Sequence, residues 1–112
     1  MSAEASSIMS EGSAFLEALK VRRFSPATVT SRQASLAVFF GWLAGSGIAD
    51  VREVSRQTVR DYQLWLQGRG YAVPTVHIHL QALRRFFEHL ETTDVILVNP
   101  CAGIMLPKLG SR

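Results

Sequence analysis

The side chains with the clearest capacity for chemistry fall in one stretch, TVHIHLQALRRFFEHL, at residues 75–90. A helix turns by about 100° per residue, so His77, Gln81, Arg84 and Arg85 fall on the arc opposite the apolar residues. Arginine offers a planar fork of donors that matches phosphate oxygens, and glutamine can pair with an adenine edge. The alternative is an ordinary solvated helix face.

Ile78 lies on the same outer arc as these polar residues. An apolar side chain there is either random scatter on the surface, a contact for a thymine methyl group in the major groove, or a contact with another domain. The sequence leaves all three open.

The sequence lacks the motifs that build catalytic, cofactor or metal sites. It contains neither a G-x-x-x-x-G-K-[ST] loop nor a G-x-G-x-x-G fingerprint. Cys101 is the single cysteine, and His77 and His79 point to different faces of a helix. Tyr62 and Tyr71 lack an arginine-histidine cluster that could activate a phosphodiester. We therefore expect no catalytic residues, no metal and no cofactor.

The 112 residues suit one domain, and their charge favours a polyanionic partner. Residues 20–90 hold ten basic side chains, nine of them arginine, against four acidic ones. No apolar run approaches the roughly 20 residues of a membrane span. The first residues do not resemble a secretory signal, and a single cysteine suits a reducing compartment. We expect a cytoplasmic protein with no membrane association.

Turn and capping signals divide the chain into helices, with no segment that alternates like a strand. The second helix should begin at Ser25 and Pro26, the third at Ser55, and a short fifth at Asn99 and Pro100. The predicted segments are a disordered terminus at 1–7, a domain at 8–105 with main helices near 8–21, 26–45, 56–67 and 74–91, and a linker at 106–112. The predicted core comprises Val29, Leu36, Phe40, Leu43, Val59, Tyr62, Leu66, Leu80, Leu83, Phe87 and Leu90.

The second and fourth helices also share a pattern. When Thr28 is aligned with Thr75, valine, leucine, a phenylalanine pair and a second leucine recur at equal offsets. This is either a structural pseudo-repeat or the same amphipathic pattern arising in two core helices.

Several segments in order resemble the core-binding domain of tyrosine recombinases, the family of phage integrases and Xer proteins. They are SPATVTSRQASLAVFFGWL, then TVHIHLQALRRFFEHL, then Asn99-Pro100 and Pro107-Lys108, and together they span roughly residues 12–109. No single segment is specific, whereas the ordered set at these spacings is. The resemblance implies an all-α, SAM-like fold: a compact four-helix domain with a short fifth helix.

The resemblance also implies a function, which is to clamp one side of double-stranded DNA during integration and recombination. The catalytic domain of such proteins would follow Pro107-Lys108, so we expect a non-catalytic chain that is monomeric in isolation. It would be either an excised domain, which the abrupt stop favours, or a naturally truncated protein. Its partners would be DNA, its own catalytic domain and other recombinase protomers. The implied DNA-binding residues lie on the fourth helix and at the starts of the second and fourth: Thr28, Thr30, Thr75, His77, Gln81, Arg84 and Arg85.

Two other functions compete with this one. A small protein-interaction module would expose an apolar patch containing Trp42, Trp65 and Ile78. A stand-alone DNA-binding regulator would be a dimer whose half-sites lie one helical turn apart.

Overall fold

Residues 8–104, the part of the chain that the computed structural model describes, contain four α-helices and a short 3-10 helix joined by turns. The helices are α1 (Ile8–Val21), α2 (Pro26–Gly45), α3 (Arg56–Gly68) and α4 (Val73–Thr92), with the 3-10 helix η1 (Val51–Glu53) between α2 and α3. The described residues contain no strand, which confirms the predicted all-α class. Residues 1–7 and 105–112 lie outside them, so the predicted disordered terminus and linker are not described.

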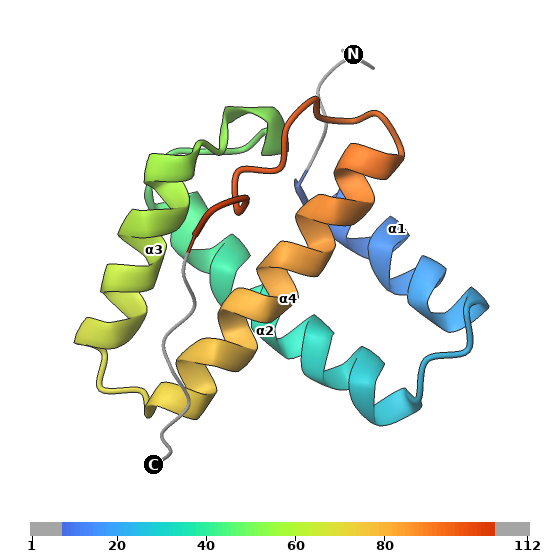
Figure 1. Cartoon of the computed structure of the whole chain (residues 1–112), viewed down its shortest axis with the longest axis horizontal. Helices are drawn as coiled ribbons and strands as arrows, with labels where there is room; N and C mark the ends of the chain where they lie inside the picture. Colours follow the sequence, from blue (N-terminus) through green and yellow to red (C-terminus); the bar gives the residue numbers. More distant parts are fainter. Residues whose placement is uncertain (1–7, 105–112) are drawn as a thin grey trace.

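Helix α4 crosses in front of α2, with α1 and α3 on opposite sides of the crossing (Figure 1). α2 packs against both α1 and α4, and α3 packs against α4. The N-terminal halves of α2 and α4 are consequently brought together on one side of the molecule. This crossing positions the candidate interface described below.

The helix starts follow from their capping residues. The Ser25 hydroxyl accepts a hydrogen bond from the Thr28 amide at 3.1 Å, and Ser55 and Thr58 form a reciprocal capping box. Helix α4 begins one residue earlier than predicted, and its N-cap, Ala72, supplies no side-chain bond. α2 and α3 therefore have side-chain caps, whereas the start of α4 depends on backbone bonds and tertiary packing.

The predicted fifth helix is wrong. Asn99 and Pro100 instead begin a turn, in which the Asn99 side-chain oxygen accepts from the Cys101 amide at 2.8 Å. The chain then reaches Gly103 with φ +81°, a left-handed conformation that cannot extend a right-handed helix. Only a few residues separate the cap from this break, too few for a stable helix. The 3-10 helix η1 was not predicted.

The core is an aromatic and leucine cluster at the crossing of the helices. Phe39 lies at its centre, with its ring centroid 4.9 Å from that of Tyr62 and 6.1 Å from that of Phe87. Ten of the eleven predicted core residues are buried, while Phe40 is only partly buried. Phe39 is the fully buried one of the pair, because its ring packs against Tyr62 of α3 and Phe87 of α4.

Candidate nucleic-acid interface

A shallow groove lies between the first turns of α2 and the first half of α4. The α2 side of the groove carries small side chains and one arginine. The α4 side carries a histidine, an isoleucine and a glutamine. The lining residues are Ala27, Thr28, Ser31, Arg32, His77, Ile78 and Gln81. Thr28, His77 and Gln81, three of the predicted site residues, are thus brought together by the helix crossing.

His77 and His79 are separated by their positions on α4. His77 lines the groove, whereas His79 is buried with its ring 5.4 Å from that of Tyr71. Burial lowers the pKa of His79, although a backbone hydrogen bond at Ser35 opposes this shift. Of these two histidines, only His77 is therefore available to an external ligand.

Gln81 is half-buried, and this limits how it can bind. Its side-chain oxygen is shielded from solvent and has no hydrogen-bond partner among the described residues. Bidentate recognition of adenine requires both the oxygen and the nitrogen of the amide. In this rotamer Gln81 offers one end only, so bidentate pairing requires a rotation of the side chain.

Two of the predicted residues near the helix starts do not line the groove. Thr30 is exposed on α2, and Thr75 is half-buried in the first turn of α4, with its amide bonded to the Ala72 carbonyl at 3.0 Å. Both are within two residues of side chains that line the groove. Their contact with DNA stays a prediction.

Arg84 has a structural partner that the sequence did not reveal. Its guanidinium donates to the Ile104 carbonyl at 3.1 Å, and its own carbonyl accepts a 3.5 Å hydrogen bond from the Asn99 side chain. These contacts join α4 to the turn that follows it, over a sequence separation of 15 to 20 residues. Arg84 thus holds the C-terminal turn in place, and part of its donor capacity is occupied.

Arg85 is exposed and forms an ion pair with Glu88 at 3.0 Å. It also lines a second cavity, together with Arg22 and Arg32. Arg32 lines both the groove and this cavity, so the two hollows adjoin. The sequence did contain a signal for the role of Arg32. This arginine falls on the apolar arc of α2, and that arc faces α4.

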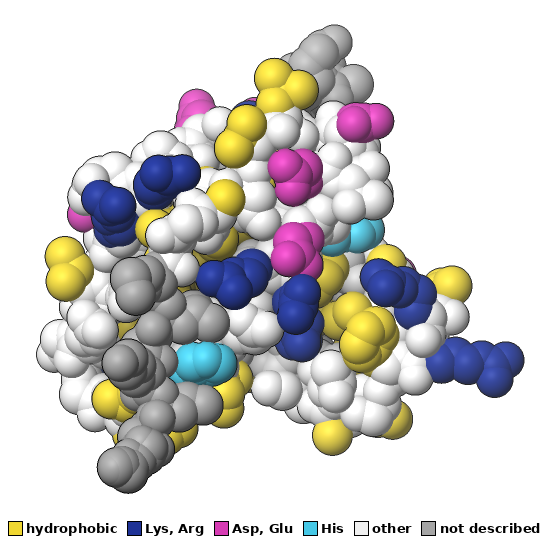
Figure 2. Space-filling model, in the orientation of Figure 1, with side chains coloured by type: hydrophobic (Ala, Val, Ile, Leu, Met, Phe, Trp, Pro, Cys, Tyr) yellow, Lys and Arg dark blue, Asp and Glu magenta, His cyan; other side chains and the backbone are white. Residues whose placement is uncertain are grey.

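Basic side chains dominate the middle of this face. Figure 2 shows Lys and Arg groups spread across the centre of the view, over α4 and toward the connection between α1 and α2, with acidic groups gathered above them. The groove and the second cavity are therefore parts of one surface whose charge excess is positive.

Two further side chains of the described region that could act as nucleophiles, Tyr62 and Cys101, are buried. Burial raises the pKa of Tyr62, whose hydroxyl has no hydrogen-bond partner there, and burial likewise raises the pKa of Cys101 to about 12. Residues 8–104 contain no cluster of three potential metal ligands. None of the helices in that range is long and apolar enough to span a membrane.

The apolar patch required by the interaction-module hypothesis is not formed as predicted. Trp42 and Trp65 are partly buried, with ring centroids 5.3 and 5.9 Å from that of Tyr62. Ile78 is 52% exposed and lines the groove on α4. The two tryptophans belong to the edge of the core and not to a surface shared with Ile78.

The fold and this surface define a small helical module with a groove between two crossing helices and a basic face beside it. The family model for the phage integrase N-terminal SAM-like domain matches residues 13–93. The chain belongs to this family.

Two relatives agree with the assignment. The tyrosine recombinase XerC of Psychromonas ingrahamii is 34% identical over 88 residues, covering 79% of this chain and 29% of the relative. XerC 2 of Ralstonia nicotianae is 33% identical over 102 residues, covering 86% and 29%. The chain thus spans less than a third of these relatives.

The fold is also that of a solved domain. The crystal structure of the N-terminal domain of a phage integrase/site-specific recombinase from Haloarcula marismortui superposes with a TM-score of 0.85. The two chains share 19% identity, and the match covers 92% of this chain and 98% of that one. This confirms the predicted SAM-like integrase fold.

Proposed function

We propose that this domain binds double-stranded DNA through the groove between α2 and α4 and the basic face beside it, as the core-binding part of a tyrosine recombinase. The observation that carries the proposal is the groove itself, which places Thr28, His77 and Gln81 together beside Arg32. Hydroxyl, imidazole, amide and guanidinium groups can all bind bases or phosphates. Membership of the phage integrase N-terminal SAM-like family supports this function for the surface.

Side chains carry most of the proposed affinity. The amides at a helix N-terminus can bind phosphate, but Pro26 and Pro74 each remove one donor from the first turn of α2 and α4. The Ser25 side chain occupies a second donor in α2, the Thr28 amide. The arginines must therefore supply most of the counterion release on binding.

The same proposal extends to the longer protein. In it, a catalytic domain following residues 106–112 closes on the other side of the duplex, and protomers assemble on DNA in the cytoplasm during integration or recombination. Residues 1–112 alone act as one half of a clamp and bind weakly.

A DNA titration with alanine variants tests this function. We expect wild-type binding to a duplex to weaken as salt rises, with the Arg84→Ala/Arg85→Ala double variant binding less tightly and with a salt slope smaller by about 1 per lost phosphate contact. His77→Ala/Gln81→Ala should weaken binding or alter sequence preference. Fluorescence anisotropy at several salt concentrations measures both.

The control is Arg60→Ala, an exposed position on α3 away from the groove. Circular dichroism must show that the double arginine variant is folded, because Arg84 also holds the Ile104 carbonyl. A folded double variant that binds like the wild type would place the interface elsewhere, and salt-independent association with a protein would favour the interaction module.

We also propose that residues 1–112 do not cleave DNA. Tyr62 is fully buried in the core, and Tyr71 packs against His79. The imidazole beside Tyr71 is that of the buried His79, and within residues 8–104 neither tyrosine hydroxyl has a hydrogen bond to a base that could activate it for attack on phosphorus. Incubation with a nicked suicide duplex should give no covalent protein–DNA product on a denaturing gel, and a shifted band that survives denaturation would refute this.

A further inference from the structure

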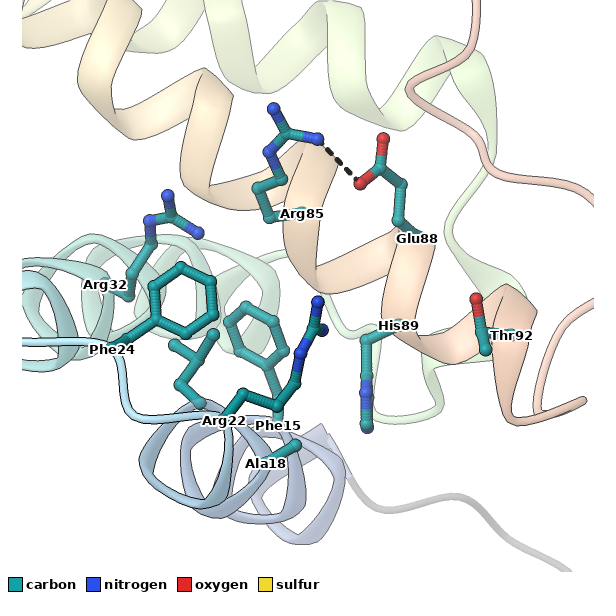
Figure 3. Close-up of a pocket in the computed structure, with 10 residues that line it drawn as sticks. Phe15, Ala18, Arg22, Phe24, Arg32, Arg85, Glu88, His89 and Thr92 are labelled. Carbon is teal, nitrogen blue, oxygen red and sulfur yellow. Dashed lines mark hydrogen bonds and ion pairs between the residues drawn. The ribbon is translucent and has the colours of Figure 1, made fainter.

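Three arginines surround a cavity at the junction of α1, α2 and α4. Arg22 comes from the turn after α1, Arg32 from α2 and Arg85 from α4 (Figure 3). One carboxylate, Glu88, also lines the cavity, and the other lining residues are Phe15, Ala18, Leu19, Phe24, His89 and Thr92. Three cationic heads from three segments thus share one space with a single carboxylate.

Backbone hydrogen bonds hold the turn after α1 in one conformation, and this sets the position from which the Arg22 side chain extends. The Phe24 amide donates to the Leu19 carbonyl at 3.1 Å, and Arg23 has φ +66°. Arg22 then lies over the Phe24 ring, with its guanidinium carbon 5.6 Å from the ring centroid. The aromatic ring holds the cation at the cavity without neutralising it.

The charges of the cavity are not balanced. Glu88 pairs with Arg85 at 3.0 Å, and this is the one ion pair drawn in Figure 3. Within residues 8–104, neither Arg22 nor Arg32 forms an ion pair with a carboxylate. Two guanidinium groups are therefore left over for an external anion.

Arg32 is under electrostatic strain. Burial lowers its pKa, and the nearby charge of Arg85 lowers it further. Like charges held close together in a partly buried site repel each other, and a bound anion removes that repulsion. A phosphodiester suits the site because its oxygens accept from several guanidinium groups at once.

We propose that this cavity, with Arg22 and Arg32 as its donors, seats one backbone phosphate of the DNA duplex, and that Glu88 competes with that phosphate for Arg85. The inference rests on the proposed DNA binding, because Arg32 lines both the cavity and the α2–α4 groove. A duplex seated on the groove brings its backbone to the neighbouring cavity. The phosphate displaces the Glu88 carboxylate, and Arg85 turns from an internal partner to the DNA.

The test uses charge-removing variants that keep most of the side chain. Arg22→Gln and Arg32→Gln are compared with Arg60→Gln, which removes the same charge from an exposed position on α3 outside the cavity. We expect each cavity variant to lower the salt slope of duplex binding by about 1 more than the control does. Glutamine retains part of the aliphatic stem of Arg32, and circular dichroism checks folding.

A second pair of variants tests the competition. Glu88→Gln should tighten DNA binding more than Glu91→Gln does, although both remove one negative charge from α4. Glu91 is exposed and lies outside the cavity, so its effect measures general electrostatics alone. An equal gain from the two variants would overturn the competition by Glu88.

The source of the phosphate is decided by a parallel titration with inorganic phosphate, followed by NMR of the arginine side chains. Duplex binding that depends on Arg32, with no saturable binding of inorganic phosphate, supports a DNA phosphate. Saturable binding of inorganic phosphate, together with an Arg32→Gln variant that binds DNA like Arg60→Gln, overturns the proposal in favour of a free-anion site. A third outcome separates the cavity from the groove. If the wild type binds DNA but Arg22→Gln and Arg32→Gln have the same salt slope as Arg60→Gln, the phosphate site in the cavity is refuted, whereas DNA binding at the groove is not.

Discussion

Leu83→Ala is expected to lower the free energy of unfolding by roughly 2–5 kcal/mol, a large share of the 5–15 kcal/mol typical of a natural domain. Leu83 is fully buried on the inner face of α4. Truncation removes its apolar transfer energy and leaves a cavity that the surrounding core fills only in part. Urea denaturation followed by circular dichroism measures the shift in midpoint.

Leu64→Ala on α3 is the matched control. Leu64 is 66% exposed, so the same truncation there should change stability by no more than about 0.5 kcal/mol. Equal losses from the two variants would mean that Leu83 is not in the core, and the helix crossing would then be wrong.

Local sequence features were enough to predict most of the fold. Ser25 with Pro26, and Ser55 with Thr58, mark helix starts because the side chain and the amide it caps lie within three residues. Gly47 and Gly70, with φ of +80° and +85°, end α2 and α3 in the conformation that glycine adopts at little cost. The predicted fifth helix failed because the same cap-and-proline pattern also begins a turn, and only Gly103 after it decides between the two.

The core residues that differ from prediction show where periodicity is insufficient. A helix wheel cannot say which of two adjacent phenylalanines is covered completely, because this depends on where the neighbouring helices cross. Phe39 is fully buried against α3 and α4 residues, while Phe40 lies closer to α1, beside Gly12. The difference between the two rings is tertiary in origin.

The same limit applies to the candidate site. The wheel placed His77, Gln81, Arg84 and Arg85 on one outer face of α4, but the elements packed against α4 divide them. The Ile104 carbonyl accepts a hydrogen bond from Arg84. Helix α2 forms a groove with His77 and Gln81, and the end of α1 forms a cavity beside Arg85. The residue pattern within α4 cannot predict these contacts, because the partners lie 20 or more residues away in the sequence.

Replacing glycine by alanine should have opposite effects at two positions of the α1–α2 packing. Gly41 lies inside α2, and a Cβ there would meet nothing within 4 Å, so Gly41→Ala should stabilise the domain by about 0.5–1 kcal/mol through the helix preference of alanine. Gly12 lies inside α1, where a Cβ would come within 2.7 Å of Cε2 of Phe40. Gly12→Ala should gain the same preference and lose about 1–3 kcal/mol to overpacking.

The gap between the two variants isolates the contact, because the helix-propensity gain is common to both. The Phe40 ring resists displacement, since its centroid lies 5.6 Å from that of Phe86 and 6.0 Å from that of Phe39. Phe40→Leu should therefore relieve Gly12→Ala in a double-mutant cycle and leave Gly41→Ala unaffected. If urea denaturation gives equal stabilities for the two alanine variants, α1 does not approach α2 as closely as the Gly12–Phe40 contact requires.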